Sequence, residues 1–291
     1  MSDSLRANQA DWRLECVGLS VSRGGRRVLA DVTVALRPGE CVSVVGPNGS
    51  GKTTLMLALL GLLPPSAGAV RWDGRDPARL SARQRGRFVA YVPQNVDHVP
   101  PFRVWDVVAD GRFPYLAWLG RCAPADDEAV RGALALCGLT ELAERPFHAL
   151  SGGERRKALL AAAIAQDAPL LFLDEPNTAL DPGYQIELLR ILGDWLRGGR
   201  GLLVISHDLE LPAVLGGRVV ALRTGRVVAD GPAAEVLTPE ALMRVYAAPF
   251  ETVTAADGRR LVLPRWWPAA TSAPRVPGRG TGAECSRDAG Q

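Results

Sequence analysis

A glycine-rich segment near residue 50 has the residue types needed to hold a row of phosphates. It fits the spacing Gly-x4-Gly-Lys-Ser/Thr and lies between a β-rich run and a run with helical composition. The glycines let several backbone N–H groups point inward at a phosphate, and the start of the following helix adds its positive dipole end. A nucleoside triphosphate is therefore the expected ligand. The predicted nucleotide-binding residues are Gly46, Pro47, Asn48, Gly49, Ser50, Gly51, Lys52, Thr53 and Thr54.

The lysine and threonine of this motif are expected to have different tasks. Of 34 basic residues only Lys52 and Lys157 are lysines, so the first stands out among arginines. A compact ammonium fits inside a loop where a guanidinium would not. We expect Lys52 to neutralise the β- and γ-phosphates and the Thr53 hydroxyl to be a ligand of Mg²⁺.

A pair of carboxylates follows four apolar residues, Leu170 to Leu173. A buried strand at 170–173 would place Asp174 at its C-terminal edge, where open α/β sheets bind ligands. There Asp174 would hold Mg²⁺, and Glu175 would polarise the water that attacks the γ-phosphate. Together with the phosphate loop, this acid pair predicts an ATPase site.

A third motif, Ser151-Gly152-Gly153-Glu154, opens a segment with helical spacing. Ser151 and Glu154 fit a capping box, so one reading is simply a well-capped helix. That reading does not explain Gly152 and Gly153, which expose backbone N–H groups and suit the close approach of a phosphate. Since the helix start near Thr53 already serves one nucleotide, the expected ligand here is the nucleotide of a second subunit.

The elements that must position these residues follow from the apolar pattern. Residues 12–36 alternate apolar and polar side chains around Gly24-Gly25, which predicts an antiparallel hairpin. A strand at 41–45 is expected to enter the phosphate loop, and a helix is expected over 53–63. From about 95 to 167 the strand signals give way to helical spacing.

Strand signals return in three runs of four apolar residues, at 170–173, 202–205 and 219–222. Such runs, separated by helical segments, predict an α/β fold with a parallel sheet covered on both faces. Gly225-Arg226 is expected to turn the chain into a final hairpin strand.

Composition limits the remaining possibilities. With 47% hydrophobic residues the chain can bury a large core, and a net charge of +3 on 34 basic and 31 acidic residues is too balanced to indicate nucleic-acid binding. No run reaches the roughly 18 apolar residues of a membrane helix, so a soluble protein is expected. Five scattered cysteines predict reduced thiols, with neither a disulfide framework nor a zinc site. Residues 1–11 are expected to be flexible and the tail at 265–291 disordered.

The ordered motifs resemble those of the nucleotide-binding subunits of ATP-binding-cassette (ABC) transporters. Ser151 lies 23 residues before Asp174 in the sequence, which matches the family's signature spacing. Gln94 matches the family's glutamine loop, Asp181 its dimer-interface aspartate, and His207 its switch histidine.

The resemblance implies a P-loop NTPase core over 12–264, with a mostly parallel sheet, an N-terminal antiparallel β-subdomain and a helical signature subdomain at about 95–167. In this family two subunits pair head-to-tail, and each ATP lies between one phosphate loop and the other subunit's signature, Ser151 to Glu154. The implied roles are catalysis by Lys52, Gln94, Glu175 and His207, Mg²⁺ binding by Thr53, Gln94 and Asp174, and coupling of the two sites by Asp181.

Two positions depart from the family pattern. Arg23 stands where an aromatic residue usually stacks on adenine, although a guanidinium can also stack on a base. The order of residues in Pro176-Asn177-Thr178-Ala179 also differs from the usual one.

The stretch Val104 to Tyr115 resembles the Val…Gly-Arg-x-Pro stretch of importers for iron siderophores, haem and cobalamin, and so does the run from Gly231 to Tyr246. The resemblance implies a homodimer on the cytoplasmic face of the inner membrane, working with two permease subunits and, indirectly, a substrate-binding protein. Residues 95–102 are expected to meet the permease.

Other assignments stay open on the sequence. One is an ATPase of another importer subclass, and another is a regulator that uses ATP only as a clamp. A soluble DNA-repair or translation factor is a third, but this chain has neither the sustained heptads of the repair members nor the two cassettes of the translation members.

Overall fold

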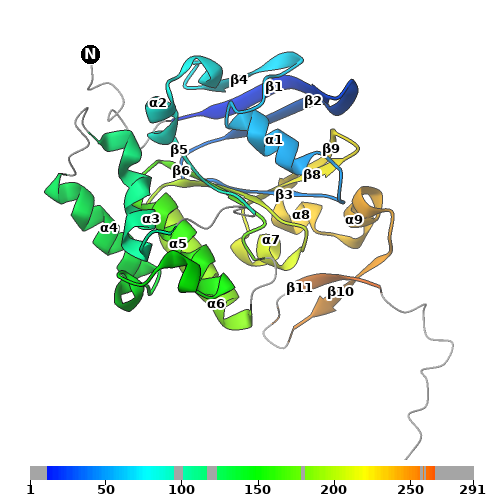
Figure 1. The fold of residues 1–291 in the computed structure, drawn as a ribbon. Coiled ribbons are helices and arrows are strands. Elements are labelled where there is room, and N and C mark those ends of the chain that lie inside the picture. The colour runs from blue at the N-terminus through cyan, green and yellow to red at the C-terminus, as the bar shows by residue number, and fades with distance from the viewer. Residues whose placement is uncertain are drawn as a thin grey trace, which may run out of the picture.

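The computed structural model describes residues 12–94, 101–116, 123–177, 181–255, 258 and 260–265. An antiparallel sheet, a central sheet, a group of helices and a C-terminal hairpin lie side by side (Figure 1). The expectations for residues 1–11, for 95–100 and for the tail beyond Arg265 lie outside the described residues.

The antiparallel sheet has the strand order β2-β1-β4. The predicted hairpin is confirmed, because β1 and β2 pair antiparallel and turn at Gly24-Gly25, where both residues have positive φ. The third strand, β4, was not predicted, since its Ala-Gly-Ala start has little strand propensity. The bounds are β1 (Leu14–Arg23), β2 (Arg26–Leu36) and β4 (Ala67–Trp72).

The central sheet has six strands in the order β5-β6-β7-β3-β8-β9, parallel except for the last. The predicted parallel sheet is therefore confirmed. Every residue of β3, β6 and β7 is buried, which explains why these strands appear as unbroken apolar runs. The bounds are β3 (Cys41–Val45), β5 (Val89–Val92), β6 (Leu170–Asp174), β7 (Gly201–Ile205), β8 (Arg218–Arg223) and β9 (Arg226–Pro232).

One helix follows the phosphate loop, and a longer one follows the acid pair. The first, α1 (Lys52–Leu59), begins one residue earlier than predicted and ends before Leu63, because residues 60–63 leave the helix in turns. The second, α6 (Pro182–Arg197), begins at the proline after Asp181 and packs its apolar face into the same core as β6 and β7.

The predicted helical middle is confirmed as far as the structure describes it. Its helix α5 packs against α3 and α4, and together they form the group at the left of Figure 1. The elements are η1 (Pro77–Arg79), α2 (Ala82–Gly86), α3 (Val104–Ala109), η2 (Asp110–Tyr115), α4 (Pro124–Leu136), η3 (Thr140–Leu142), η4 (Phe147–Ala149) and α5 (Gly152–Ala165), the first two of which precede β5.

The C-terminal part adds three short helices and a two-stranded hairpin, and the hairpin was not predicted. The bounds are α7 (Glu210–Leu215), α8 (Ala233–Val236), α9 (Pro239–Tyr246), β10 (Phe250–Thr254) and β11 (Arg260–Pro264).

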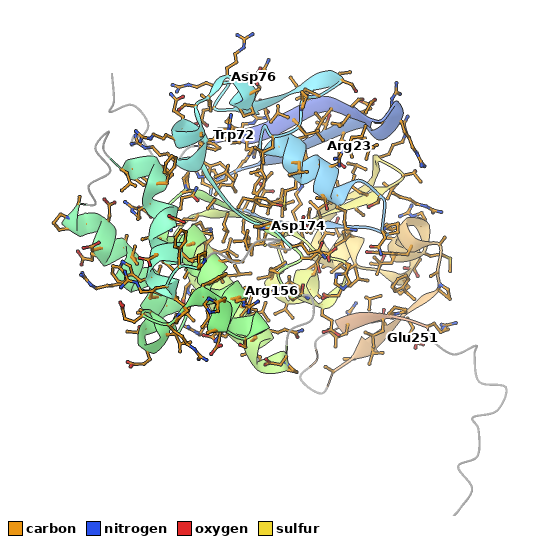
Figure 2. All side chains as sticks on the ribbon, in the orientation of Figure 1. Arg23, Trp72, Asp76, Arg156, Asp174 and Glu251 are labelled. Atoms are coloured by element: carbon orange, nitrogen blue, oxygen red, sulfur yellow. The ribbon has the colours of Figure 1, made fainter. Side chains whose placement is uncertain are left out.

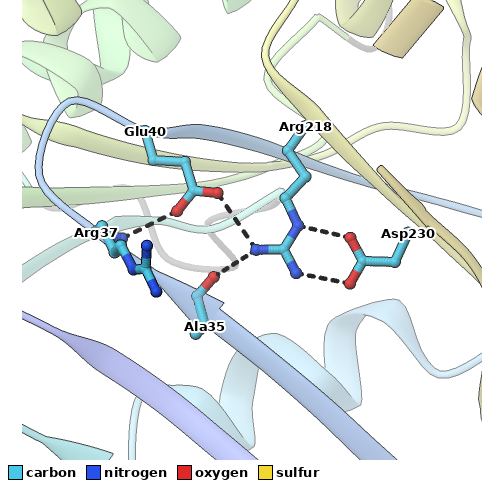
Figure 3. A network of polar contacts seen from close by, with 5 residues as sticks. All are labelled: Ala35, Arg37, Glu40, Arg218 and Asp230. Atoms are coloured by element: carbon cyan, nitrogen blue, oxygen red, sulfur yellow. Dashed lines mark hydrogen bonds and ion pairs between the residues drawn. The ribbon is translucent and has the colours of Figure 1, made fainter. Parts of the chain in front are cut away.

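One arginine ties the antiparallel sheet to the central sheet (Figure 3). Arg218 pairs with Asp230 at 2.5 and 2.6 Å, and its Nη1 also donates to the Ala35 carbonyl at 3.0 Å. The same nitrogen lies 3.3 Å from Glu40, which accepts the Arg37 N–H. A single guanidinium thus joins β8 and β9 to the end of β2 and the loop that leads into β3.

Among the described residues, the cysteines Cys16, Cys41 and Cys137 are free and buried. In the ranges that the structure describes, no helix is both long and apolar enough to cross a membrane.

Candidate nucleotide site

Two glycines of the phosphate loop, Gly46 and Gly51, leave no room for a Cβ atom. Gly46 follows β3 with φ of +148°, and a Cβ there would lie 2.1 Å from the Leu222 carbonyl oxygen. Gly51 has φ of +104°, and its Cβ would meet the Leu29 side chain at 2.7 Å. The loop is therefore a backbone cradle, as its sequence predicts.

The cradle also leaves one polar atom for a ligand. Ser50 Oγ is buried and has no hydrogen-bond partner among the described residues. A buried hydroxyl without a partner costs free energy, so a phosphate oxygen at this position would satisfy it. The loop thus fits the nucleotide expected from its sequence.

Lys52 is curled back into the loop. Its ammonium donates to the Gly46 carbonyl at 2.7 Å and to the Pro47 carbonyl at 3.3 Å, and the residue is only 7% exposed. Burial lowers the pKa of Lys52, while the charges of Glu175 and Asp174 act to raise it. The cation is thus held between the loop and the acid pair, where phosphate oxygens would compete for it.

Asp174 ends β6 as predicted, and it is 5% exposed. Its carboxylate accepts a hydrogen bond from the Thr53 hydroxyl at the start of α1. Burial, followed by the charge of Glu175, raises the pKa of Asp174 to about 6. Two adjoining carboxylates in a buried place therefore favour a cation beside them.

Thr53 and Asp174 fit Mg²⁺, which proteins commonly hold through one or two oxygen ligands while phosphates supply others. A dedicated all-protein cage is not seen, since the described residues contain no group of three or more His, Cys, Asp or Glu that could hold a metal ion. The third predicted ligand, Gln94, contacts Glu175 in this structure.

Glu175 is held in an unusual backbone conformation, with φ of +50°. Its N–H donates to the Ile205 carbonyl of the neighbouring strand β7 at 3.0 Å. A non-glycine residue at positive φ is uncommon and persists where its surroundings hold it. Here the strand pair β6–β7 supplies that support.

Two predicted residues converge on the Glu175 carboxylate. Gln94 Nε2 donates to Oε2 at 2.5 Å, and His207 Nδ1 lies 3.4 Å from the same oxygen. The three residues follow β5, β6 and β7, which are neighbours in the sheet. The arrangement suits a general base oriented by two flanking groups.

One contributor to the loop was not identified from the sequence. The turn between β8 and β9 touches the phosphate loop, because the Gly225 N–H donates to the Ser50 carbonyl at 3.0 Å. The Gly225 carbonyl accepts from the Ala30 N–H at 2.8 Å. Gly225-Arg226 predicts a turn, but local sequence carries no signal for this long-range contact.

The signature motif starts α5 with the predicted capping box. Ser151 Oγ accepts from the Glu154 N–H at 3.2 Å, and the Glu154 carboxylate accepts from the Ser151 N–H at 2.7 Å. Ser151 and Gly152 are exposed, and Cβ atoms at Gly152 and Gly153 would meet nothing within 4 Å. The start of α5 is therefore open to a ligand.

Gly152 and the acid pair line one cavity of about 150 Å³. No residue of the phosphate loop is among the described residues that line this cavity. Within one chain, the start of α5 and the phosphate loop therefore do not share this cavity.

The remaining predicted residues lie apart from the acid pair. Asp181 caps α6, where its carboxylate accepts the Tyr184 N–H at 3.0 Å, and it is exposed. Arg23 is exposed at the end of β1, away from Asp174 in Figure 2.

Comparison with known proteins agrees with this geometry. The sequence model of the ABC transporter family matches residues 29–178. The chain is 44% identical to the hemin import ATP-binding protein HmuV of Nocardia farcinica, over 86% of this chain and 88% of that protein. It is 35% identical to the iron(3+)-hydroxamate import ATP-binding protein FhuC of Bacillus subtilis, over 81% and 88%.

A solved structure of a metal-chelate type ABC transporter in an inward-facing conformation superposes with a TM-score of 0.76 at 25% identity. The match covers 87% of this chain and 97% of that one. The family match covers more than half of the chain, and the site has the phosphate loop and acid pair of an ATPase. The chain therefore belongs to the ABC transporter family, as one of its ATP-hydrolysing subunits.

Proposed function

We propose that this chain energises the import of haem or of a related metal chelate, such as a siderophore or a cobalamin-like complex. The support for the substrate class is the identity to proteins named for hemin and iron(3+)-hydroxamate import. The observation that carries the catalytic part is the convergence of Gln94 and His207 on the Glu175 carboxylate.

Glu175 would orient the attacking water and take its proton, while His207 would contact the γ-phosphate. Lys52 would exchange its bonds to the Gly46 and Pro47 carbonyls for bonds to phosphate oxygens. Mg²⁺, held by Thr53, Asp174 and Gln94, would neutralise the charge that develops on the phosphates. Arg23 would lie against the base, since a guanidinium can stack on a ring.

The partner of the site is proposed to be a second copy of this chain. The start of α5 is exposed and open, and the cavity beside it is not lined by the phosphate loop of the same chain. In the dimer, Ser151 to Glu154 of each copy would cover the ATP held by the other, and Asp181 would couple the two sites. Two permease subunits would hold this dimer at the cytoplasmic face of the membrane.

Replacing Glu175 with Gln tests the catalytic part. Glu175→Gln keeps the Oε atom that faces Gln94 and His207 but removes the base, so ATP binding should persist while turnover falls by about 100-fold or more. Size-exclusion chromatography should show a dimer trapped by ATP. Phosphate release at the wild-type rate would remove Glu175 from its role.

The substrate class is tested by transport. The chain, co-purified with its own permease, is reconstituted in liposomes and supplied with binding protein and haem, ferric hydroxamate or cobalamin in separate assays. ATP-dependent uptake of haem is the expected result, with Glu175→Gln as the inactive control. Uptake of none of the three would refute the metal-chelate assignment without touching the ATPase assignment.

A further inference from the structure

We propose that Asn177 is a positioning residue, which ties the loop after Glu175 to the loop after His207 and so fixes their relative placement. Asn177 lies in the segment whose residue order departs from the family pattern. Its Nδ2 donates to Oδ2 of Asp208, which directly follows His207. Asn177 is 8% exposed, and the bond is partly buried.

The Asp208 carboxylate divides its two oxygens between two tasks. Oδ1 accepts the N–H groups of Glu210 and Leu211, both at 3.1 Å, and so caps the start of α7. Oδ2 accepts the Asn177 amide. The loop that carries His207 is therefore anchored to α7 on one side and to the Glu175 loop on the other.

A second hydrogen bond connects the segment of Glu175 to the segment of His207. The Glu175 N–H donates to the Ile205 carbonyl, two residues before His207. One of the two bonds therefore involves a residue before His207 in the sequence, and the other involves the residue after it. His207 Nδ1, between them, lies 3.4 Å from Glu175 Oε2. Because Glu175 has positive φ, its side chain keeps this direction only while neighbouring bonds hold the backbone.

The chemistry of the pair explains why an amide is needed. Asp208 is an acceptor, so the residue opposite must donate; asparagine does so without adding a buried charge. An aspartate at the same position would place two carboxylates face to face and push the loops apart. The proposal rests on the ATPase role of Glu175 and adds a residue that acts through it.

A charge-swap series tests the pair. Asn177→Asp should lower kcat at pH 8 by about 10- to 100-fold, as expected when a catalytic group is misplaced by about 1 Å. The dissociation constant for ATP should stay within about twofold, because the phosphate loop is unchanged. Asn177→Asp combined with Asp208→Asn restores a donor facing an acceptor and keeps the oxygen that caps α7. This double variant should recover kcat to within about threefold of wild type.

Two further readouts separate positioning from stability. The kcat of Asn177→Asp relative to wild type should rise as pH falls from 8 towards 6, because one carboxyl of the facing pair then takes up a proton. Asp76→Asn is the matched control: Asp76 caps η1 through the Ala78 N–H and lies at the outer edge of the molecule in Figure 2. It should leave kcat unchanged.

The proposal is overturned if Asn177→Asp retains wild-type kcat, or if the double variant folds with the wild-type Tm but stays as slow as the single variant. Should Asn177→Asp fail to fold, Asn177→Ala, which removes the donor without adding charge, replaces it and should also lower kcat with unchanged ATP affinity. Loss of turnover in Glu175→Gln beside a fully active Asn177→Asp would refute this inference alone. Wild-type turnover in Glu175→Gln would refute the proposed function.

Discussion

At the scale of single residues, the site concentrates negative charge where water is excluded. Asp174 is nearly buried beside Glu175, and the Lys52 ammonium lies near enough to feel the charge of both. The pKa of Asp174 is raised from 3.8 to about 6. In the nucleotide-free protein, burial and the charge of Glu175 therefore destabilise the ionised Asp174 carboxylate. A bound metal ion would offset this cost.

The first prediction concerns the stability of the nucleotide-free protein. Since the folded protein binds the Asp174 proton more tightly than the unfolded chain, its stability falls as pH rises from about 4 to about 6 and stays lowered above that. Asp174→Asn keeps the acceptor for Thr53 and removes the charge. At pH 7.5 it should raise the Tm by about 2 to 5 °C, and Mg²⁺-dependent ATPase activity should be lost.

Thermal unfolding at pH 7.5 and pH 5 checks this prediction. The difference between Asp174→Asn and wild type should shrink at pH 5, where the wild-type carboxyl is mostly protonated. A Tm below that of wild type at pH 7.5 would show that the carboxylate stabilises the empty site.

At the scale of elements, the β8–β9 turn locks the phosphate loop from outside. A Cβ on Gly225 would lie 2.2 Å from the Val28 carbonyl oxygen, and the residue has φ of +77°. Gly74 offers a matched control, because it has φ of +75° but open space around its Cβ. Both positions carry the same backbone strain, and only one carries the contact.

The second prediction is that Gly225→Ala weakens ATP binding and Gly74→Ala does not. Each variant should lose about 1 kcal/mol of stability from the left-handed backbone. Gly225→Ala must in addition displace β2 or the turn, which loosens the bond to Ser50 and should raise the dissociation constant for ATP by about tenfold. Calorimetric titration with ATP measures the effect. Equal affinities in the two variants would show that the turn does not support the loop.

The elements also show what could be predicted from the sequence. Runs such as Leu170–Leu173 predict strands because burial on both faces demands apolar residues throughout, and the glycines of the loop predict its backbone shape. The strands β4 and β10–β11 have no such pattern, since one edge or face of them is exposed.

The sequence points to candidate site residues one at a time, but it carries no signal for the contacts between them. Gln94, Glu175 and His207 meet because β5, β6 and β7 are neighbours, and strand order is fixed by long-range packing. The bond between Asn177 and Asp208 joins two loops for the same reason. In the sequence, this asparagine shows only as a departure from the family order.

At the scale of the whole molecule, each chain carries one open phosphate loop and one open signature. In a head-to-tail dimer, each site combines the phosphate loop of one chain with the signature of the other. A chain with a defective loop and a chain with a defective signature would therefore still form one intact site between them. Ser151→Asp keeps a good helix cap, so the fold should be preserved, but its charge would repel the partner's phosphate. Lys52→Ala removes the cation from the loop of the same chain.

The third prediction is that each of these variants is inactive alone and that their mixture is active. Random pairing makes half of the dimers mixed, and each of these holds one intact site of two, so about a quarter of wild-type ATPase activity is expected. Phosphate release from the mixture measures it. A mixture as inactive as its components would contradict a site shared between two chains.

The scarcity of lysine has a practical consequence for labelling. Apart from the chain's own amino terminus, an acylating reagent finds only Lys52 and Lys157. Lys157 is engaged with Glu187, whereas Lys52 lies inside the cradle, where its amine donates to the Gly46 and Pro47 carbonyls. Covalent tagging of this one amine would therefore report occupancy of the cradle, and ATP would shield it from the reagent.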